Sequence, residues 1–140
     1  MDLSVVIVNY RSRDDLLSCL SRLPDAARGL ETEVVVVDNA SEDGAGVALA
    51  KWHPNARFIQ NLENVGYSRA VNQGLRATRG QFAMILNPDC ELHAGAARRL
   101  VDYLRTHPRT GIAAPRILNS DGTLEYSVRS YPDQYTFLFN

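Results

Sequence analysis

Three short runs of apolar residues set the strongest constraint on how this chain can fold. They occupy residues 3–8, 33–37 and 82–86, show almost no polar alternation, and each ends abruptly in polar side chains. Such runs are typical of parallel strands that are covered on both faces of a sheet. Segments with apolar residues at helical spacing lie between them.

Strands that alternate with helices predict an α/β fold. We expect a Rossmann-like, doubly wound and mostly parallel sheet with right-handed connections and helices on both faces. A weaker strand is expected at residues 56–60 and another at 112–118, and Asn119 to Gly122 indicate a C-terminal hairpin leading into residues 123–126. The expected helices cover residues 14–23, 46–52, 67–78 and 93–107.

Polar and helix-breaking residues mark the expected helix ends. Ser12 or Asp14 is available to cap the first helix, and Pro24 should break the chain after it. The side chains of residues 38–41 can cap the second helix. Gly66 permits an unusual backbone conformation in the polar loop before the third helix.

Composition places the chain among single globular domains. It has 140 residues, of which 45% are hydrophobic, which is enough to bury a core. The formal net charge of −1 argues against a nucleic-acid partner, because binding to phosphate backbones needs a concentrated basic surface. The N-terminus lacks a signal-peptide pattern, and no apolar run approaches a membrane span. We therefore expect a cytoplasmic protein, placed at the inner face of the membrane if the full-length chain is longer.

The two cysteines, Cys19 and Cys90, lie far apart and have no His-rich or CxxC context. They predict neither a zinc site nor a disulfide framework. Cys90 is interpreted as a small apolar filler. His93 follows soon after Asp89, but we interpret it as a solvated residue at a helix start rather than a metal ligand.

The candidate chemistry lies where the expected strands end. Asn87-Pro88-Asp89 follows the strand at 82–86, and Asp38 follows the strand at 33–37. Because open α/β sheets bind ligands beyond the carboxyl ends of their strands, three strand ends can converge on one crevice. The alternative for Asn87-Pro88-Asp89 is an ordinary turn, since Asn-Pro starts turns and Asp suits them. The alternative for residues 38–41 is a helix cap, which is compatible with Asp38 facing a ligand.

Two common nucleotide sites are absent from the sequence. A dinucleotide fold would follow its first strand with a glycine-rich turn, but here Asn9-Tyr10-Arg11-Ser12-Arg13 follows it. No Walker P-loop is present either. Polar strand tips and a carboxylate suited to a hard metal ion remain.

Four stretches, in this order and spacing, resemble family 2 glycosyltransferases of the GT-A fold, most closely the rhamnosyltransferase-like branch. They read SVVIVNYRSRDDLLSCL, VVVVDNASEDG, NLENVGYSRAVNQGL and FAMILNPDCEL. The resemblance implies a metal-dependent, inverting glycosyltransferase, of hexosyltransferase or rhamnosyltransferase type, acting in polysaccharide biosynthesis of the cell envelope. Its donor would be a dTDP-, UDP- or GDP-linked sugar, and its acceptor a cell-envelope polysaccharide or lipid-linked glycan.

The resemblance also assigns residues. Asn9 and Tyr10 would lie against the nucleoside, and Asp38 would hydrogen-bond the base or ribose with Asn39 beside it. Further residues implied on the nucleotide-sugar side are Asn64, Gly66, Arg69, Asn72 and Asn87. Asp89 would hold Mg²⁺ or Mn²⁺, because a divalent cation stabilises the charge on a nucleoside diphosphate leaving group.

The family places its general base in a later segment, so no catalytic residue is assigned. Residues 1–140 are then expected to be the donor-binding part, cut before the acceptor-binding segment. The alternative is a non-catalytic nucleotide-sugar-binding or assembly module of the same fold. A nucleotidyltransferase would need a glycine-rich, basic phosphate loop after the first strand, which is not seen. Aromatic residues near the C-terminus predict a homodimer: Tyr131, Tyr135, Phe137 and Phe139.

Overall fold

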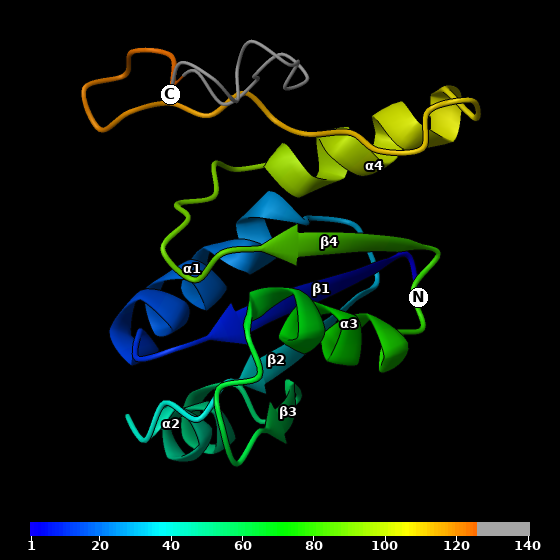
Figure 1. Ribbon diagram of the computed structural model, residues 1–140. Helices are drawn as coiled ribbons and strands as arrows, with labels where there is room; N and C mark the ends of the chain where they lie inside the picture. The colour runs from blue at the N-terminus through cyan, green and yellow to red at the C-terminus, as the bar shows by residue number, and fades with distance from the viewer. Residues whose placement is uncertain (126–140) are drawn as a thin grey trace, which may run out of the picture.

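A parallel sheet of four strands forms the centre of the computed structural model, which describes residues 1–125 (Figure 1). The strands lie in the order β3-β2-β1-β4, and their bounds are β1 (Leu3–Asn9), β2 (Thr32–Asp38), β3 (Arg57–Gln60) and β4 (Phe82–Leu86). The register puts Asn9 opposite Asp38, so the polar tips of β1 and β2 are neighbours. The winding reverses between β1 and β4, which is where doubly wound sheets bind ligands.

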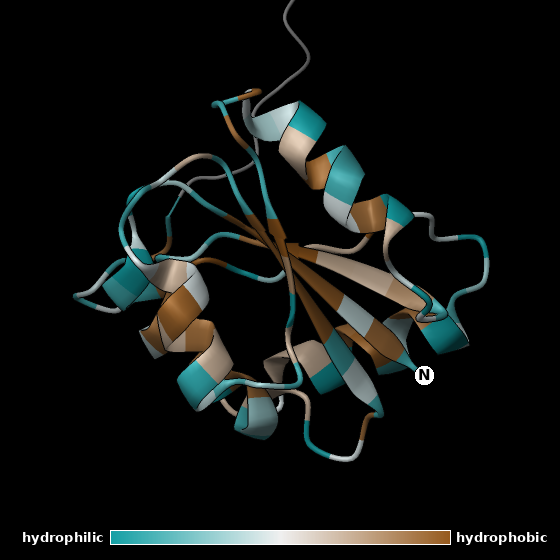
Figure 2. Cartoon of the chain, turned by 90° about the horizontal axis from the view of Figure 1, so that it is seen from below, coloured by the Kyte–Doolittle hydropathy of each residue, from teal (hydrophilic) through white to brown (hydrophobic). Residues whose placement is uncertain are grey.

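Helices cover both faces of this sheet. They are α1 (Arg13–Ala26), α2 (Ala45–Trp52), α3 (Tyr67–Arg76) and α4 (Ala96–Thr106). One face packs against α3, and the other against α1, α2 and α4. Figure 2 shows the hydrophobic residues gathered along the strands and on the helix sides turned toward them. The doubly wound α/β fold predicted from the sequence is confirmed.

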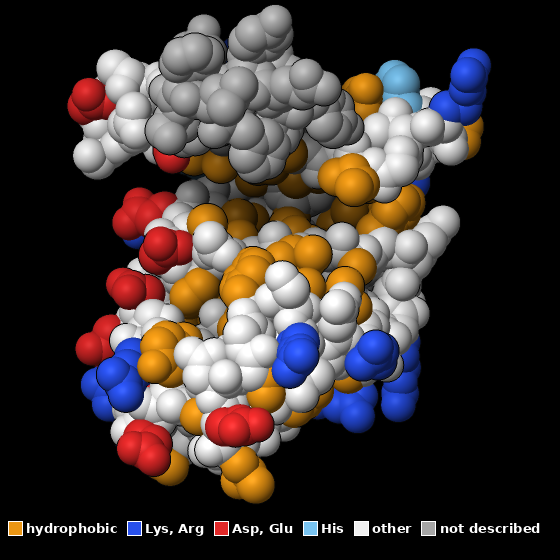
Figure 3. Space-filling view, viewed as in Figure 1, with side chains coloured by type: hydrophobic (Ala, Val, Ile, Leu, Met, Phe, Trp, Pro, Cys, Tyr) orange, Lys and Arg blue, Asp and Glu red, His pale blue; other side chains and the backbone are white. Residues whose placement is uncertain are grey.

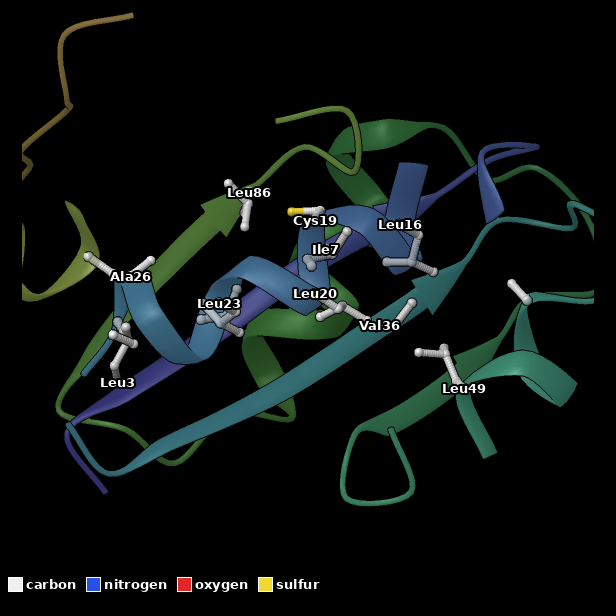
Figure 4. Close-up of a cluster of buried hydrophobic side chains, with 14 of the residues drawn as sticks. Leu3, Ile7, Leu16, Cys19, Leu20, Leu23, Ala26, Val36, Leu49 and Leu86 are labelled. Atoms are coloured by element: carbon white, nitrogen blue, oxygen red, sulfur yellow. The ribbon is translucent and has the colours of Figure 1, made fainter. Parts of the chain in front are cut away.

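Strand β1 is the centre of the core because both of its faces are covered. All seven of its residues are buried. Leu3, Val5 and Ile7 face α1, where Leu16 and Leu20 contact the same cluster (Figure 4). Val8, on the opposite face, packs with Val37, Ala70 and Val71. An unbroken apolar run is therefore what this position requires, since each such side chain contributes about 1.5–3 kcal/mol when buried.

The approach of α3 to the sheet depends on Gly74. A Cβ atom at this position would lie 2.3 Å from Val6 Cγ1 and 3.3 Å from Val37 Cγ2. We expect Gly74→Ala to lower the free energy of unfolding by about 2 kcal/mol, because overpacking outweighs the gain in helix propensity. Urea unfolding measures this. Gly111→Ala is the control, because no described atom lies within 4 Å of that site; equal stability of both variants would show that α3 is free to shift.

Two helix ends differ from the prediction. The expected break at Pro24 is wrong, because α1 continues through it to Ala26. Pro24 lies in the last turn, where its missing N–H removes only one helical hydrogen bond. Ser12 precedes α1 but makes no side-chain cap, since its hydroxyl donates to Asn9 Oδ1 at 3.0 Å.

Helix α4 starts at Ala96, three residues later than expected, whereas α2 starts at Ala45, one residue before the expected start. Glycines with positive φ precede both helices, Gly44 at +78° and Gly95 at +72°. Residues 38–41 therefore do not cap α2. Asp43 accepts a hydrogen bond from the Ala45 N–H at 3.0 Å instead.

The strand expected at residues 112–118 is wrong. Up to residue 125, this part of the chain shows only an isolated antiparallel bridge between Leu118 and Leu124. The hairpin turn itself forms, with the Asn119 N–H bonded to the Thr123 carbonyl at 2.8 Å. Tyr126 and the aromatic residues on which the homodimer prediction rests lie outside the described residues. No helix within residues 1–125 is long and apolar enough to cross a membrane.

Candidate functional site

A crevice of about 570 Å³ opens at the carboxyl edge of the sheet. It lies where the tips of β1, β2 and β4 meet the first residue of α3. Eight of its ten lining residues carry a polar side-chain group, and the lining consists of Val8, Tyr10, Ser12, Asp15, Asn39, Asn64, Tyr67, Asn87, Pro88 and Asp89. A larger hollow of about 750 Å³, between the ends of α1 and α2, contains none of the predicted site residues.

Asn9 is the centre of a buried hydrogen-bond network beneath the crevice. Its Nδ2 donates to Asp38 Oδ1 at 2.8 Å, to Ser41 Oγ at 3.0 Å and to Asp43 Oδ2 at 3.1 Å. The second oxygen of Asp38 accepts from the Ser41 N–H at 3.1 Å. Asn9 is fully buried and Asp38 is 2% exposed. The arrangement holds the tips of β1 and β2 together, because a buried carboxylate is stable only when its oxygens are satisfied.

Asn39 connects the tip of β2 to the loop that precedes α3. Its Nδ2 donates to Asn64 Oδ1 at 2.7 Å, and its Oδ1 accepts from the Val65 N–H at 3.0 Å. Asn64 Oδ1 also accepts from the Gly66 N–H at 2.9 Å. Gly66 then turns the chain into α3 at φ +84° and ψ 155°, a conformation that side chains disfavour. These bonds fix the position of the helix start.

Backbone strain gathers at the same edge. Three residues other than glycine have positive φ among the described residues, and they are Arg11 at +56°, Ala40 at +63° and Glu42 at +54°. All three follow the tips of β1 or β2. Strained backbone of this kind costs of order 1–3 kcal/mol and clusters at functional sites.

The segment Asn87-Pro88-Asp89 is a turn that also faces the crevice. The Cys90 N–H donates to the Asn87 carbonyl at 3.2 Å, and Cys19 Sγ lies 3.8 Å from the same oxygen. The Tyr67 hydroxyl donates to Asn87 Oδ1 at 3.0 Å. Asp89 is exposed, and its carboxylate has no hydrogen-bond partner within residues 1–125. The turn interpretation and the site interpretation are thus both compatible with this geometry.

The crevice is acidic. Its described lining includes the carboxylates of Asp15 and Asp89 and no lysine or arginine. Acidic side chains also gather on the side of the molecule toward which β1 and β4 point (Figure 3). No group of three potential metal ligands of the His, Cys, Asp or Glu type is gathered within residues 1–125. This donor set fits Mg²⁺ or Mn²⁺, which commonly take one or two carboxylates and complete their shell with phosphate oxygens and water.

The predicted site residues fall into three groups. Five line the crevice: Tyr10, Asn39, Asn64, Asn87 and Asp89. Asn9 and Asp38 lie in the network beneath it, and Gly66 adjoins it at the start of α3. Arg69 and Asn72 are exposed on α3 and do not line the crevice.

Sequence reasoning missed Asp15 and Tyr67 as lining residues. Asp15 belongs to the acidic pair Asp14-Asp15 in the first turn of α1. This pair is the only local sequence signal for its place in the lining. Tyr67 is the first residue of α3 and is 51% exposed. His93 is exposed and lies outside the lining, as a solvated residue would.

Cys19 is buried against the turn at Asn87, and its thiol is expected to make the stability of the fold depend on pH. Burial, followed by the nearby Cys90 and Asp89, raises the pKa of Cys19 from 9.0 to about 11. Below pH 9 the thiol is protonated in both the folded and the unfolded chain, so its contribution is fully present. Between pH 9 and about 11 only the unfolded chain loses the proton, and stability should fall by about 1.4 kcal/mol per pH unit.

Urea unfolding of reduced protein from pH 8 to 11 tests this expectation. The fall should be shallower in Cys19→Ala than in the native chain, because the other titrating groups are shared. Cys90→Ala, which removes the more exposed thiol, should retain most of the fall in stability seen in the native chain. Parallel curves for the native chain and Cys19→Ala would contradict the prediction.

Comparison with known proteins now identifies the family. A parallel, doubly wound sheet with a crevice at its switch point defines the class of open α/β proteins that bind ligands beyond the carboxyl ends of their strands. The model of glycosyl transferase family 2 matches residues 4–139, so the chain belongs to this family.

Relatives of known sequence agree with this assignment. The low-salt glycan biosynthesis hexosyltransferase Agl10 of Haloferax volcanii is 35% identical over 127 residues, covering 86% of this chain and 38% of that protein. The N-acetylglucosaminyl-diphospho-decaprenol L-rhamnosyltransferase of Mycobacterium tuberculosis is 31% identical over 142 residues, covering 93% and 46%. The chain therefore spans less than half the length of both relatives.

Solved structures confirm the GT-A fold. A mannosyltransferase from Pyrobaculum calidifontis, solved in complex with GDP-Man and Mn²⁺, matches with a TM-score of 0.66 and 27% identity over 73% of this chain and 32% of its own. TarS of S. aureus, solved in complex with UDP-GlcNAc, matches with a TM-score of 0.68 and 24% identity over 77% and 32%. The resemblance inferred from the four sequence stretches is thus confirmed at the level of family and fold.

Proposed function

We propose that the crevice binds the nucleoside diphosphate part of a sugar donor and that the chain supplies the donor-binding part of a glycosyltransferase. The observation that carries this proposal is the convergence of β1, β2, β4 and the start of α3 on one polar crevice. The donor would be a dTDP-, UDP- or GDP-linked sugar. Solved relatives of the same fold bind GDP-Man or UDP-GlcNAc, which supports this donor class.

A divalent cation is part of the proposal because of the charge of the crevice. A diphosphate brings two or more negative charges to a lining that offers carboxylates and, within the described residues, no basic side chain. Mg²⁺ or Mn²⁺ held by Asp89 would convert this repulsion into attraction. When bound, the cation would stabilise the charge that develops on the departing nucleoside diphosphate.

The remaining residues take their proposed roles from their positions. Tyr10 and Asn64 line the crevice and would contact the nucleoside. Asn39 also lies at the crevice, but it is 2% exposed and both ends of its amide bond within the protein, so it would mainly hold the loop before α3 in place. Asn9 and Asp38 would act mainly by holding the strand tips in place, because their polar atoms bond within the protein. Gly66 sets the start of α3. Arg69 and Asn72 stay predictions as weaker donor contacts, since both are exposed on that helix.

The proposed reaction is an inverting transfer of a hexosyl or rhamnosyl group. The acceptor would be a cell-envelope polysaccharide or a lipid-linked glycan. The name of the mycobacterial relative, an N-acetylglucosaminyl-diphospho-decaprenol L-rhamnosyltransferase, supports the lipid-linked class. Such an acceptor would place the reaction at the cytoplasmic face of a membrane. No general base is assigned within the chain.

A non-catalytic nucleotide-sugar-binding or assembly module is the second candidate. One observation favours it: the described crevice contains only two carboxylates, Asp15 and Asp89. If both serve the cation, none remains to deprotonate an acceptor hydroxyl. Such a module would bind the donor without transferring the sugar.

Calorimetry on the 140-residue chain tests the binding proposal. The chain is titrated with UDP, dTDP and GDP and with their sugar-linked forms, each with and without Mn²⁺. We expect binding of at least one nucleotide that depends on the metal. Absence of binding under every condition would overturn the proposal, and donor binding without release of nucleoside diphosphate in the presence of glycan acceptors would favour the module.

A further inference from the structure

Tyr67 and Asn87 join two sides of the crevice through one hydrogen bond. Tyr67 is the first residue of α3, and Asn87 directly follows β4. The tyrosine hydroxyl donates to Asn87 Oδ1 at 3.0 Å, and both residues line the crevice. The bond therefore connects the start of the helix to the turn that carries Asp89.

This bond determines which end of the asparagine amide is free to meet a ligand. An amide group is planar, and its oxygen and nitrogen point in different directions. With Oδ1 accepting from Tyr67, Nδ2 is the end that has no hydrogen-bond partner within residues 1–125. The backbone of Asn87 is held as well, since its carbonyl accepts from the Cys90 N–H at 3.2 Å.

The two ends of the amide have opposite chemistry. Mg²⁺ and Mn²⁺ bind oxygen, whereas the NH₂ group offers two hydrogen-bond donors and no oxygen for a metal. A phosphate oxygen needs donors. In a crevice whose described lining has no lysine or arginine, an oriented NH₂ group is a suitable partner for such an oxygen.

We propose that Asn87 donates a hydrogen bond to the diphosphate of the nucleotide sugar instead of binding the cation, and that Tyr67 is the positioning residue that orients it. The inference rests on the proposed function and adds a division of labour to it. Asp89 serves the cation, and Asn87 serves the anion. In this arrangement Asn87 and Asp89 are not two ligands of one metal ion.

The state of the tyrosine hydroxyl supports this role. Partial burial, together with the nearby Cys90, raises the pKa of Tyr67 above its ordinary value of 10.0. The hydroxyl therefore keeps its proton through neutral and mildly alkaline pH. It therefore remains the hydrogen-bond donor to Asn87 Oδ1.

Tyr67→Phe and Asn87→Ala test the proposal, with Tyr103→Phe as the matched control. Tyr103 is 46% exposed on α4, and its hydroxyl has no partner within residues 1–125. Calorimetry measures binding of Mn²⁺ alone and, separately, binding at saturating Mg²⁺ of whichever of UDP, dTDP and GDP binds the native chain most tightly. Thermal unfolding of each variant verifies that it is folded.

We expect Asn87→Ala to weaken nucleotide binding by about tenfold, the effect of one hydrogen bond to a charged group. Tyr67→Phe should weaken it by about threefold to tenfold in the native background and have no further effect in the Asn87→Ala background. Neither variant should change the affinity for Mn²⁺ alone. Tyr103→Phe should behave like the native chain in both assays.

A spectroscopic measurement separates a ligand contact from a structural role. In ¹⁵N NMR spectra, the side-chain NH₂ signal of Asn87 is identified by its loss in Asn87→Ala. It should shift when the nucleotide saturates the native chain, and the shift should shrink in Tyr67→Phe.

Three results would overturn the inference while leaving donor binding intact. They are weaker Mn²⁺ binding in Asn87→Ala, native-like nucleotide binding in both variants, and an unshifted NH₂ signal at saturation. The first would make Asn87 a metal ligand. A native chain that binds none of the nucleotides would overturn the proposed function and this inference together.

Discussion

Asp89→Asn is expected to abolish metal-dependent nucleotide binding. The substitution keeps the shape of the side chain but removes the charge that we propose to hold the cation. Without the cation, the diphosphate would face an acidic crevice whose described lining has no basic side chain. We expect the affinity for the nucleoside diphosphate in the presence of Mn²⁺ to fall by about 100-fold or more, measured by calorimetry.

Glu91→Gln is the matched control for this substitution. It makes the same change of charge two residues further along, on an exposed carboxylate that lies 3.4 Å from Arg22 and outside the crevice lining. This variant should bind nucleotide like the native chain. If Asp89→Asn also retained native, Mn²⁺-dependent binding, Asp89 would not be the metal ligand, and the proposed site would need a different carboxylate.

Asn9→Ala is expected to cause a large loss of stability. Asn9 Nδ2 donates to three acceptors, and its loss leaves the carboxylate of Asp38, which is 2% exposed, without one of its two donors. A buried charged group that loses a hydrogen bond costs about 2–3 kcal/mol. Urea unfolding at neutral pH measures this loss.

The isosteric variant Asn9→Asp sharpens the test. It keeps the volume of the side chain but replaces the donor by a carboxylate about 3 Å from the oxygens of Asp38 and Asp43. We expect it to be at least as destabilising as Asn9→Ala, by about 3 kcal/mol or more. Asn55→Ala serves as the control, because that exposed side chain makes no hydrogen bond within residues 1–125. Stability losses below about 0.5 kcal/mol in both Asn9 variants would show that the network is not structurally important.

Much of the fold could be predicted because burial leaves a strong pattern in the sequence. A strand covered on both faces excludes water from every side chain, so β1 and β2 read as continuous apolar runs. The helices that cover them show their apolar spacing in the same way, as Ala70 and Val71 do on α3. A prediction based on a single residue failed at Pro24. The proline was expected to end the helix, but it fits into the last turn of α1, which continues to Ala26.

The candidate site was predictable only in outline. Parallel strands bring their carboxyl ends to one edge, so the convergence of the polar tips follows from topology. The direction of each polar side chain does not follow from it. Asn9 and Asp38 have the same polar, strand-end character as Asp89, yet they are buried in a hydrogen-bond network.

The sequence by itself determined the class of fold, the family and the edge of the sheet at which a ligand can bind, because these depend on local apolar patterns and on the order of the strands. Only the tertiary structure decided which polar atoms are satisfied within the protein and which remain available. Hydrogen-bond partners such as Tyr67 and Asn87 are 20 residues apart and meet only when α3 packs on β1 and β2, which brings its first residue to the turn after β4. Their pairing depends on distances and directions in space, which the sequence does not record.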